Sequence, residues 1–180
     1  SRTNPQAQRG DDVVSRIGHA RKSRAARDEL QALVTGALDE ILAETCAAVD
    51  AQPEDVYLIS ACGNTTMHHL LLGIDPAYIA ESPFIAAARR GLTIHARHTG
   101  LRAGHGARLY AVPNISAYVG GDIVAGLLAQ QVHEANDTAL MIDVGTNGEM
   151  ALRADGATYA CSTAAGPAFE GARISCGMRA

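Results

Sequence analysis

The segment from Ala139 to Leu152 contains the residue types that bind phosphate groups. An apolar run ends at Asp143, and a second apolar run follows a turn made of Gly145, Thr146, Asn147 and Gly148. Glycine permits positive φ angles and close approach of backbone N–H groups to an anion. A carboxylate at the end of an apolar strand is suited to bind Mg²⁺ or to orient a nucleophile. We therefore expect a buried strand, a phosphate-binding hairpin, and Asp143 as the catalytic and magnesium-binding residue.

An ordinary β-turn is the alternative for this segment, because Asn-Gly is a strong hairpin signal by itself. A second candidate anion site is the sequence Gly63-Asn64-Thr65-Thr66, which follows an apolar strand over residues 55–62 and precedes a helix over residues 67–72. Ligands gather at such strand ends in open α/β sheets. A routine capped turn, with either threonine as the helix cap, is an equally simple interpretation.

Asp122 is a third candidate because it follows two glycines at the start of an apolar helix. A carboxylate is favoured in the first turn of a helix. The position therefore fits either a helix cap or a neighbour of the magnesium ion.

The composition excludes several other classes of protein. The chain has 180 residues, of which 47% are hydrophobic and 19% are charged, and its net charge is −4. This charge argues against nucleic-acid binding, and the basic cluster from Arg16 to Arg27 is expected to be a solvated helix face. The sequence shows no apolar run long enough to span a membrane and no signal peptide, so we expect a cytoplasmic protein without a membrane partner.

The cysteine and histidine residues do not form a recognisable metal motif. The four cysteines are far apart and lack C-x-x-C spacing, which argues against a zinc or iron-sulfur site in this chain. Adjacent helical residues point about 100° apart, so His68 and His69 are expected to be structural. The same is expected of His95 and His98, which are assigned to a loop.

The remaining pattern predicts alternating helices and strands. Helices are expected from Asp11 and over residues 28–50, a strand over residues 107–112, and a strand over residues 158–162 after a turn at Asp155-Gly156. Residues 75–106 contain many prolines and glycines and are expected to form a connection without a strand. Three meandering strands after this helix-strand alternation indicate an α/β protein with actin-like (RNase H-like) lobes. Scarce aromatic residues mean that alanine and glycine must build much of the core.

Five segments together resemble one family, the ATP-dependent reductive activators of corrinoid proteins. The segments are Asn4-Pro5-Gln6 with residues 10–17, residues 63–73, residues 112–116 with 120–122, the Asp143 hairpin, and residues 161–172 with 176–179. The family combines a ferredoxin-like domain with an actin-like ATPase. The resemblance implies that ATP, with Mg²⁺, drives the reduction of a Co(II) corrinoid to Co(I) on a methyl-transfer protein. The electron comes from a [2Fe-2S] cluster that this chain does not bind.

The resemblance also assigns residues and domains. It places ATP on Asp143, Gly145, Thr146 and Asn147, and on the nucleotide side of lobe two at Gly166, Pro167 and Glu170. Residues 1–135 are expected to be the remainder of lobe one, and residues 136–180 the start of lobe two. The expected partners are the corrinoid protein and the protein's own ferredoxin-like domain, and a homodimer is compatible with the pattern.

Two features depart from the family pattern. No Asp-x-Gly-Thr-Thr hairpin precedes Asn4, and the ferredoxin cysteines are absent. We therefore expect a fragment of a longer activase that is inactive alone. The alternatives are another actin-like phosphotransferase, an activator of radical dehydratases, and a non-catalytic docking or dimerisation module.

Overall fold

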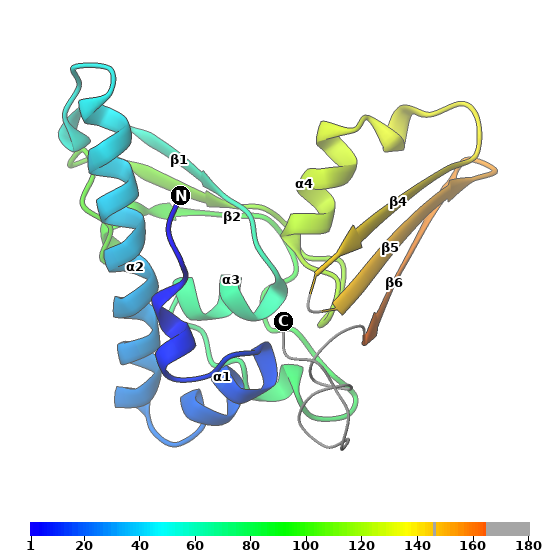
Figure 1. Cartoon of the computed structure of the whole chain (residues 1–180), viewed down its shortest axis with the longest axis horizontal. Helices are drawn as coiled ribbons and strands as arrows, with labels where there is room; N and C mark the ends of the chain where they lie inside the picture. Colours follow the sequence, from blue (N-terminus) through cyan, green and yellow to red (C-terminus); the bar gives the residue numbers. More distant parts are fainter. Residues whose placement is uncertain (146, 165–180) are drawn as a thin grey trace.

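The computed structural model describes residues 1–145 and 147–164, which form two three-stranded sheets with helices packed on them (Figure 1). The helices are α1 (Val13–Ala20), α2 (Arg24–Ala47), α3 (Thr65–Leu71) and α4 (Gly121–Ala129). Short 3₁₀ turns connect them: η1 (Pro5–Gln8), η2 (Pro53–Asp55), η3 (Ala77–Ile79), η4 (Ala96–Thr99) and η5 (Val132–Glu134). No helix in the described part of the chain is long and apolar enough to cross a membrane.

The first two helices begin at side-chain caps. Asp12 accepts a hydrogen bond from the Ser15 N–H, and Ser15 Oγ accepts one from the Asp12 N–H, which together form a capping box for α1. Ser23 caps α2 through the Ala26 N–H. This cap starts α2 four residues earlier than its predicted start at residue 28.

The first sheet has the order β1-β3-β2. Strand β1 (Leu58–Ala61) lies parallel to β3 (Arg108–Ala111), and β2 (Leu92–His95) lies antiparallel to β3. The prediction that residues 75–106 contain no strand is therefore wrong. Four residues between glycine and a 3₁₀ turn give too short a pattern to predict. His95 lies in β2 and His98 in η4, so their assignment to a loop is also wrong.

Helices α2 and α3 cover this sheet and bury its apolar side chains (Figure 1). Leu71 of α3 and Leu109 of β3 are buried in one cluster with Leu101, and Val34 and Leu38 of α2 pack against it. The Ala and Leu content of this cluster fits the expected small-residue packing between helices and sheet. The turn before α3 therefore connects two packed elements, strand β1 and helix α3.

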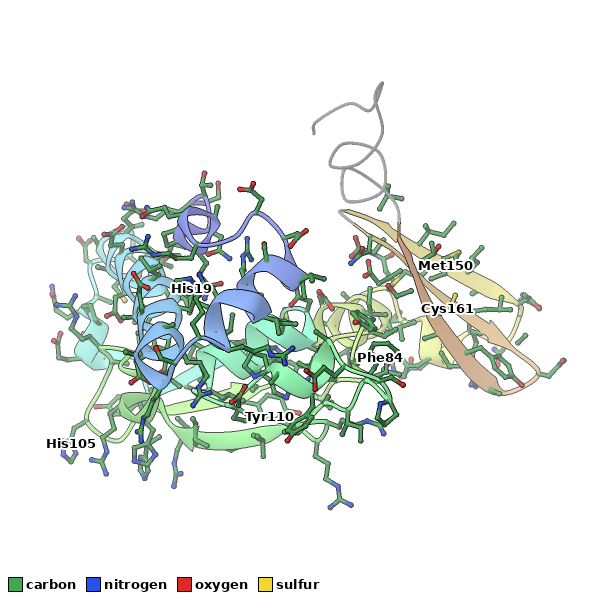
Figure 2. All side chains as sticks on the ribbon, turned by 90° about the horizontal axis from the view of Figure 1, so that it is seen from below. His19, Phe84, His105, Tyr110, Met150 and Cys161 are labelled. Carbon is green, nitrogen blue, oxygen red and sulfur yellow. The ribbon has the colours of Figure 1, made fainter. Side chains whose placement is uncertain are left out.

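The second sheet is an antiparallel meander of β4 (Ala139–Val144), β5 (Asn147–Ala154) and β6 (Ala157–Ala164). The turn predicted at Asp155-Gly156 is confirmed, with φ angles of 51° and 76°. Figure 2 shows the cross-strand pair Met150 and Cys161 on this sheet, far from His105 on the other sheet's side of the molecule.

Helix α4 covers one face of the meander, where its Ile123 and Leu127 pack with Ala151. The other face of β4 is exposed: Leu140, Ile142 and Val144 are 57%, 55% and 83% accessible. The prediction of a buried strand is therefore wrong for this face. Strand β4 is an edge strand of the described sheet, and α4 contacts only one of its faces.

Candidate functional site

A cleft of about 590 Å³ lies between the start of α1, the turn before α3, the start of α4 and the β4–β5 hairpin. In Figure 1 these segments approach one another in the middle of the molecule. Seven residues of the candidate segments line this cleft: Asn64, Thr65, Thr66, Asp122, Asp143, Gly145 and Asn147. The three candidate segments, distant in sequence, thus contribute to one cavity.

The β4–β5 hairpin contributes two carboxylates to the cleft. Asp143 and Glu149 are direct cross-strand partners, so their side chains project from the same face of the sheet. Asp143 is exposed, whereas Glu149 is half-buried and accepts a hydrogen bond from Ser162 Oγ at 3.1 Å. Sequence analysis missed Glu149 and Ser162, because their positions beside Asp143 depend on the strand register.

The glycines of the hairpin are less constrained than expected. Gly145 lines the cleft without a positive φ, so of the two properties that glycine permits, only close approach to an anion is available at this position. Its N–H donates to the Asn147 carbonyl at 2.9 Å, and a Cβ at Gly145 would come no closer than 3.7 Å to the Asn147 oxygen. Gly148 is buried in β5 opposite Val144. Thr146 lies outside the described residues.

The turn before α3 uses its polar side chains within the protein. Asn64, not a threonine as predicted, caps the helix by accepting a hydrogen bond from the Met67 N–H at 2.9 Å. Thr65 Oγ1 donates to the Ser116 carbonyl at 2.6 Å. Thr66 also lines the cleft, and its Oγ1 is buried without a hydrogen-bond partner among the described residues.

Close backbone packing joins this turn to the start of α4. A Cβ at Gly120 would lie 2.5 Å from Asn64 Cα, so only glycine permits the approach. The Asp122 N–H donates to the Gly63 carbonyl at 3.2 Å, which places Gly63 behind the cleft wall. Gly120 occupies the cap position of α4, and Asp122 lies in the first turn. The alternative of Asp122 as the cap is therefore wrong.

The carboxylates of the cleft influence one another. Burial, and then the negative charges of Asp122 and Asp143, raise the pKa of Glu149 above its ordinary value, while the Ser162 hydrogen bond opposes this rise. A cation in the cleft would relieve this repulsion. Carboxylate oxygens are also the ligands that Mg²⁺ prefers.

The start of α1 contributes cleft residues that sequence analysis did not predict as part of the site. Asp11, Asp12 and Arg16 line the cleft, although the Arg16–Arg27 cluster was expected to be a solvated helix face. Arg16 is half-buried. The signal that could have indicated this site was the segment 10–17, one of the five segments that resemble the family.

His69 has the structural role predicted for it. The ring is fully buried, its Nδ1 lies 2.7 Å from the Thr65 carbonyl, and its Nε2 lies 3.0 Å from the Ala87 N–H. Burial lowers the pKa of both His68 and His69, which favours neutral rings. Neither residue lines the cleft.

Several candidates lie elsewhere. Gly166, Pro167, Glu170 and Cys176 lie outside the described residues, and the structure gives no account of their place. Cys46 is buried, whereas Cys62 and Cys161 are exposed. Within residues 1–145 and 147–164, no group of three or more His, Cys, Asp or Glu side chains is arranged to hold a metal ion.

Comparison with known proteins identifies the fold as actin-like. A solved structure titled "Reductive activator for corrinoid,iron-sulfur protein" matches with a TM-score of 0.86 and 37% identity, over 98% of this chain and 28% of that chain. Residues 1–135 match the RACo middle region, and residues 137–180 match the C-terminal domain of RACo, the ASKHA domain. The chain belongs to the RACo family. The resemblance based on the five sequence segments is thus confirmed.

Two curated relatives are similar over nearly the whole chain. The corrinoid activation enzyme RamQ of Eubacterium limosum is 33% identical, over 99% of this chain and 30% of the relative. A [Co(II) methylated amine-specific corrinoid protein] reductase of Methanosarcina barkeri is 28% identical, over 93% of this chain and 34% of the relative. The chain therefore spans about a third of the length of these relatives.

Proposed function

We propose that this chain forms part of the ATP site of a reductive activator, which reduces a Co(II) corrinoid to Co(I) on a corrinoid methyl-transfer protein. The observation that carries this proposal is the convergence of the Asp143 hairpin and the Asn64 turn on one cleft. The names of the relatives supply the reaction class, since they describe corrinoid activation and corrinoid protein reduction.

In this proposal the hairpin holds the phosphates of ATP. Gly145, Thr146 and Asn147 contact phosphate oxygens, Gly148 holds the hairpin in register, and Asp143 is the catalytic carboxylate. Asn64 and Thr65, supported by Gly63, line the phosphate site from the other side of the cleft. Gly166, Pro167 and Glu170 approach the nucleotide from lobe two, as the family resemblance implies.

Magnesium fits the chemistry of this cleft. Asp122, Asp143 and Glu149 line the cleft with hard oxygen atoms, and the raised pKa of Glu149 reflects burial and then negative charge that a cation would compensate. The described side chains form no closed metal cage. Mg²⁺ commonly takes one or two carboxylates and completes its shell with phosphates and water. Bound there, it would neutralise phosphate charge, with Asp143 and Asp122 as its protein ligands or their neighbours.

The remaining parts of the reaction are assigned to the longer protein. We propose that residues 1–135 belong to the first actin-like lobe and residues 136–180 to the start of the second. A ferredoxin-like domain outside this chain holds the [2Fe-2S] cluster. When bound, this cluster would supply the one electron that converts Co(II) to Co(I) in the corrinoid protein, and ATP would supply the free energy for this uphill step.

The test uses the full-length protein with its cluster reduced and a corrinoid protein in the Co(II) state. Visible absorption follows the formation of Co(I) with and without MgATP. We expect Co(I) to accumulate only with MgATP, and ATP hydrolysis to rise when the corrinoid protein is added. Equal reduction without nucleotide would contradict the proposal. Since the chain spans about a third of the length of its relatives, we expect these residues by themselves to bind ATP no more tightly than about 1 mM.

A further inference from the structure

Arg16 is a cation in the wall of a cleft that is otherwise acidic. The acidic residues lining the cleft are Asp11, Asp12, Asp122, Asp143 and Glu149. Among the described lining residues, Arg16 is the only lysine or arginine. A nucleoside triphosphate carries several negative charges, so these carboxylates alone would repel it. A phosphate ligand in this cleft therefore needs positive charge from the protein as well as from Mg²⁺.

The backbone holds the Arg16 side chain in place. Arg16 Nε donates to the Gly10 carbonyl at 3.0 Å, and the capping box at Asp12 fixes the start of the helix that carries the residue. Arg16 Nη1 lies 3.5 Å from Met67 Sδ, and Nη2 lies 3.5 Å from the Asp11 carbonyl. Both contacts are at the limit of hydrogen-bond distance, and a thioether sulfur is a weak acceptor. The guanidinium is thus anchored at Nε and retains N–H groups for a ligand.

The electrostatic state of Arg16 differs from that of several other arginines. Arg9, Arg21 and Arg27 each pair with a carboxylate. Arg16 has no carboxylate within 4.0 Å in the part of the chain that the structure describes. Burial lowers the pKa of Arg16 below its ordinary value, and the charges of Asp12 and Asp11 oppose this effect. The side chain remains charged near neutral pH, partly desolvated and without an ion pair to the described residues.

We propose that Arg16 binds a phosphate group of the nucleotide, from a different wall of the cleft than the Asp143 hairpin. The planar guanidinium can donate two parallel hydrogen bonds to phosphate oxygens, which a lysine cannot do. This inference rests on the proposed function, because it names a further residue of the same ATP site. By this proposal, a residue of lobe one contacts the phosphate groups of the nucleotide directly.

The test compares nucleotide affinities of the full-length protein by calorimetry. Arg16→Ala should weaken binding of MgATP roughly 10- to 100-fold, the usual loss for a charge-assisted hydrogen bond. Binding of adenosine, which has no phosphate, should change less than about two-fold. Arg16→Lys should fall between the wild type and Arg16→Ala, since it keeps the charge without the planar fork. Arg24→Ala is the matched control, because its side chain is 86% exposed and outside the cleft.

The outcomes separate this inference from the proposed function. A wild-type protein that binds no ATP contradicts the proposed function itself. Wild-type binding that Arg16→Ala leaves unchanged overturns the role of Arg16 alone. Tighter ATP binding by Arg16→Ala also overturns it, and indicates that Arg16 pairs with the cleft carboxylates instead. Arg16→Gln, checked by circular dichroism, replaces the alanine variant if the latter does not fold, and the same affinity criteria apply.

Discussion

The two polar turns of the cleft differ in how their side chains are used. In the turn before α3, Asn64 Oδ1 caps the helix and Thr65 Oγ1 donates to the Ser116 carbonyl. In the β4–β5 hairpin, the exposed Asp143 side chain makes no hydrogen bond or ion pair to any residue that the structure describes. Both turns contain glycine, asparagine and threonine. Similar composition thus produces a turn that stabilises the fold and a hairpin in which the Asp143 carboxylate is free of the other described residues.

The ionisable groups of the two regions differ in the same way. Burial lowers the pKa of His68 and His69 on α3, which favours the neutral rings inside the core. Burial and neighbouring carboxylates raise the pKa of Glu149 in the cleft. The first region therefore favours neutral histidine side chains, whereas the second carries negative charge that a cation or Arg16 can offset.

The largest expected effect is the loss of ATP turnover in Asp143→Asn. Asparagine keeps the size of the side chain and removes the charge that would orient magnesium. Turnover by the full-length protein should fall at least ~100-fold, the range seen when a preorganised charge partner is lost. The free energy of unfolding should change by less than about 0.5 kcal/mol, because the side chain is exposed.

The matched control is Asp155→Asn at the other end of the same sheet. Asp155 has a φ of 51°, which asparagine also tolerates, and it does not line the cleft. Its turnover should equal that of the wild type. Near-normal turnover in Asp143→Asn would exclude the catalytic role of this carboxylate.

His69→Leu tests the other side of the comparison. The imidazole accepts hydrogen bonds from the Ala87 and Ala88 N–H groups at 3.0 and 3.3 Å, and leucine would remove this acceptor from both donors, of which Ala88 is buried. We expect the free energy of unfolding to fall by about 2–3 kcal/mol, measured by chemical denaturation. The exposed His105→Leu is the control, with a change below about 0.5 kcal/mol. Equal stability of the two variants would argue against a structural role for His69.

Much of the fold could be predicted because its signals are local. The apolar stripe of α2, the Asp155-Gly156 turn and the strands β3 and β6 follow from short patterns of residues. Strand β2 could not be predicted, since its four residues lie within residues 75–106, whose prolines and glycines favour a connection. The exposed face of β4 depends on which face α4 covers, which is a tertiary property.

The candidate site was predicted only where one segment contained the whole pattern. Asp143 and Asn147 stand together in the sequence, and Asn64 and Thr65 form a second short motif. Glu149 joins Asp143 only through the β4–β5 register, and Arg16 reaches the cleft only through the packing of α1. The spacing of these residues in the sequence predicts neither the Asp143–Glu149 pairing nor the position of Arg16 in the cleft.

Asn64 offers a way to separate capping from ligand binding within one residue. Asn64→Ala removes the cap and should lower the free energy of unfolding by about 1 kcal/mol. Asn64→Ser keeps a capping oxygen and should restore most of this loss. If Asn64 also contacts the nucleotide, calorimetry will show weaker ATP binding in both variants. Full ATP affinity in Asn64→Ser would limit the residue to its structural role.

The smallest expected effect is the opposite pH dependence of the two regions. Because the folded-state pKa of Glu149 is raised, its contribution to stability is present below the ordinary pKa of 4.5 and is lost as the pH rises through the folded pKa. Because the folded-state pKa of His68 is lowered from 6.5, its contribution is present above that value and is lost as the pH falls. Denaturation between pH 4.5 and 8 should therefore show that Glu149→Gln gains relative to the wild type as the pH rises. His68→Gln should gain stability relative to the wild type as the pH falls.

The Glu149 effect is a fraction of a kcal/mol because solvent screens the open cleft. If Mg²⁺ binds among these carboxylates, a saturating concentration should reduce the Glu149 effect further. If the unfolding free energies of both variants follow the same pH dependence as the wild type, the electrostatic difference between the two regions is contradicted.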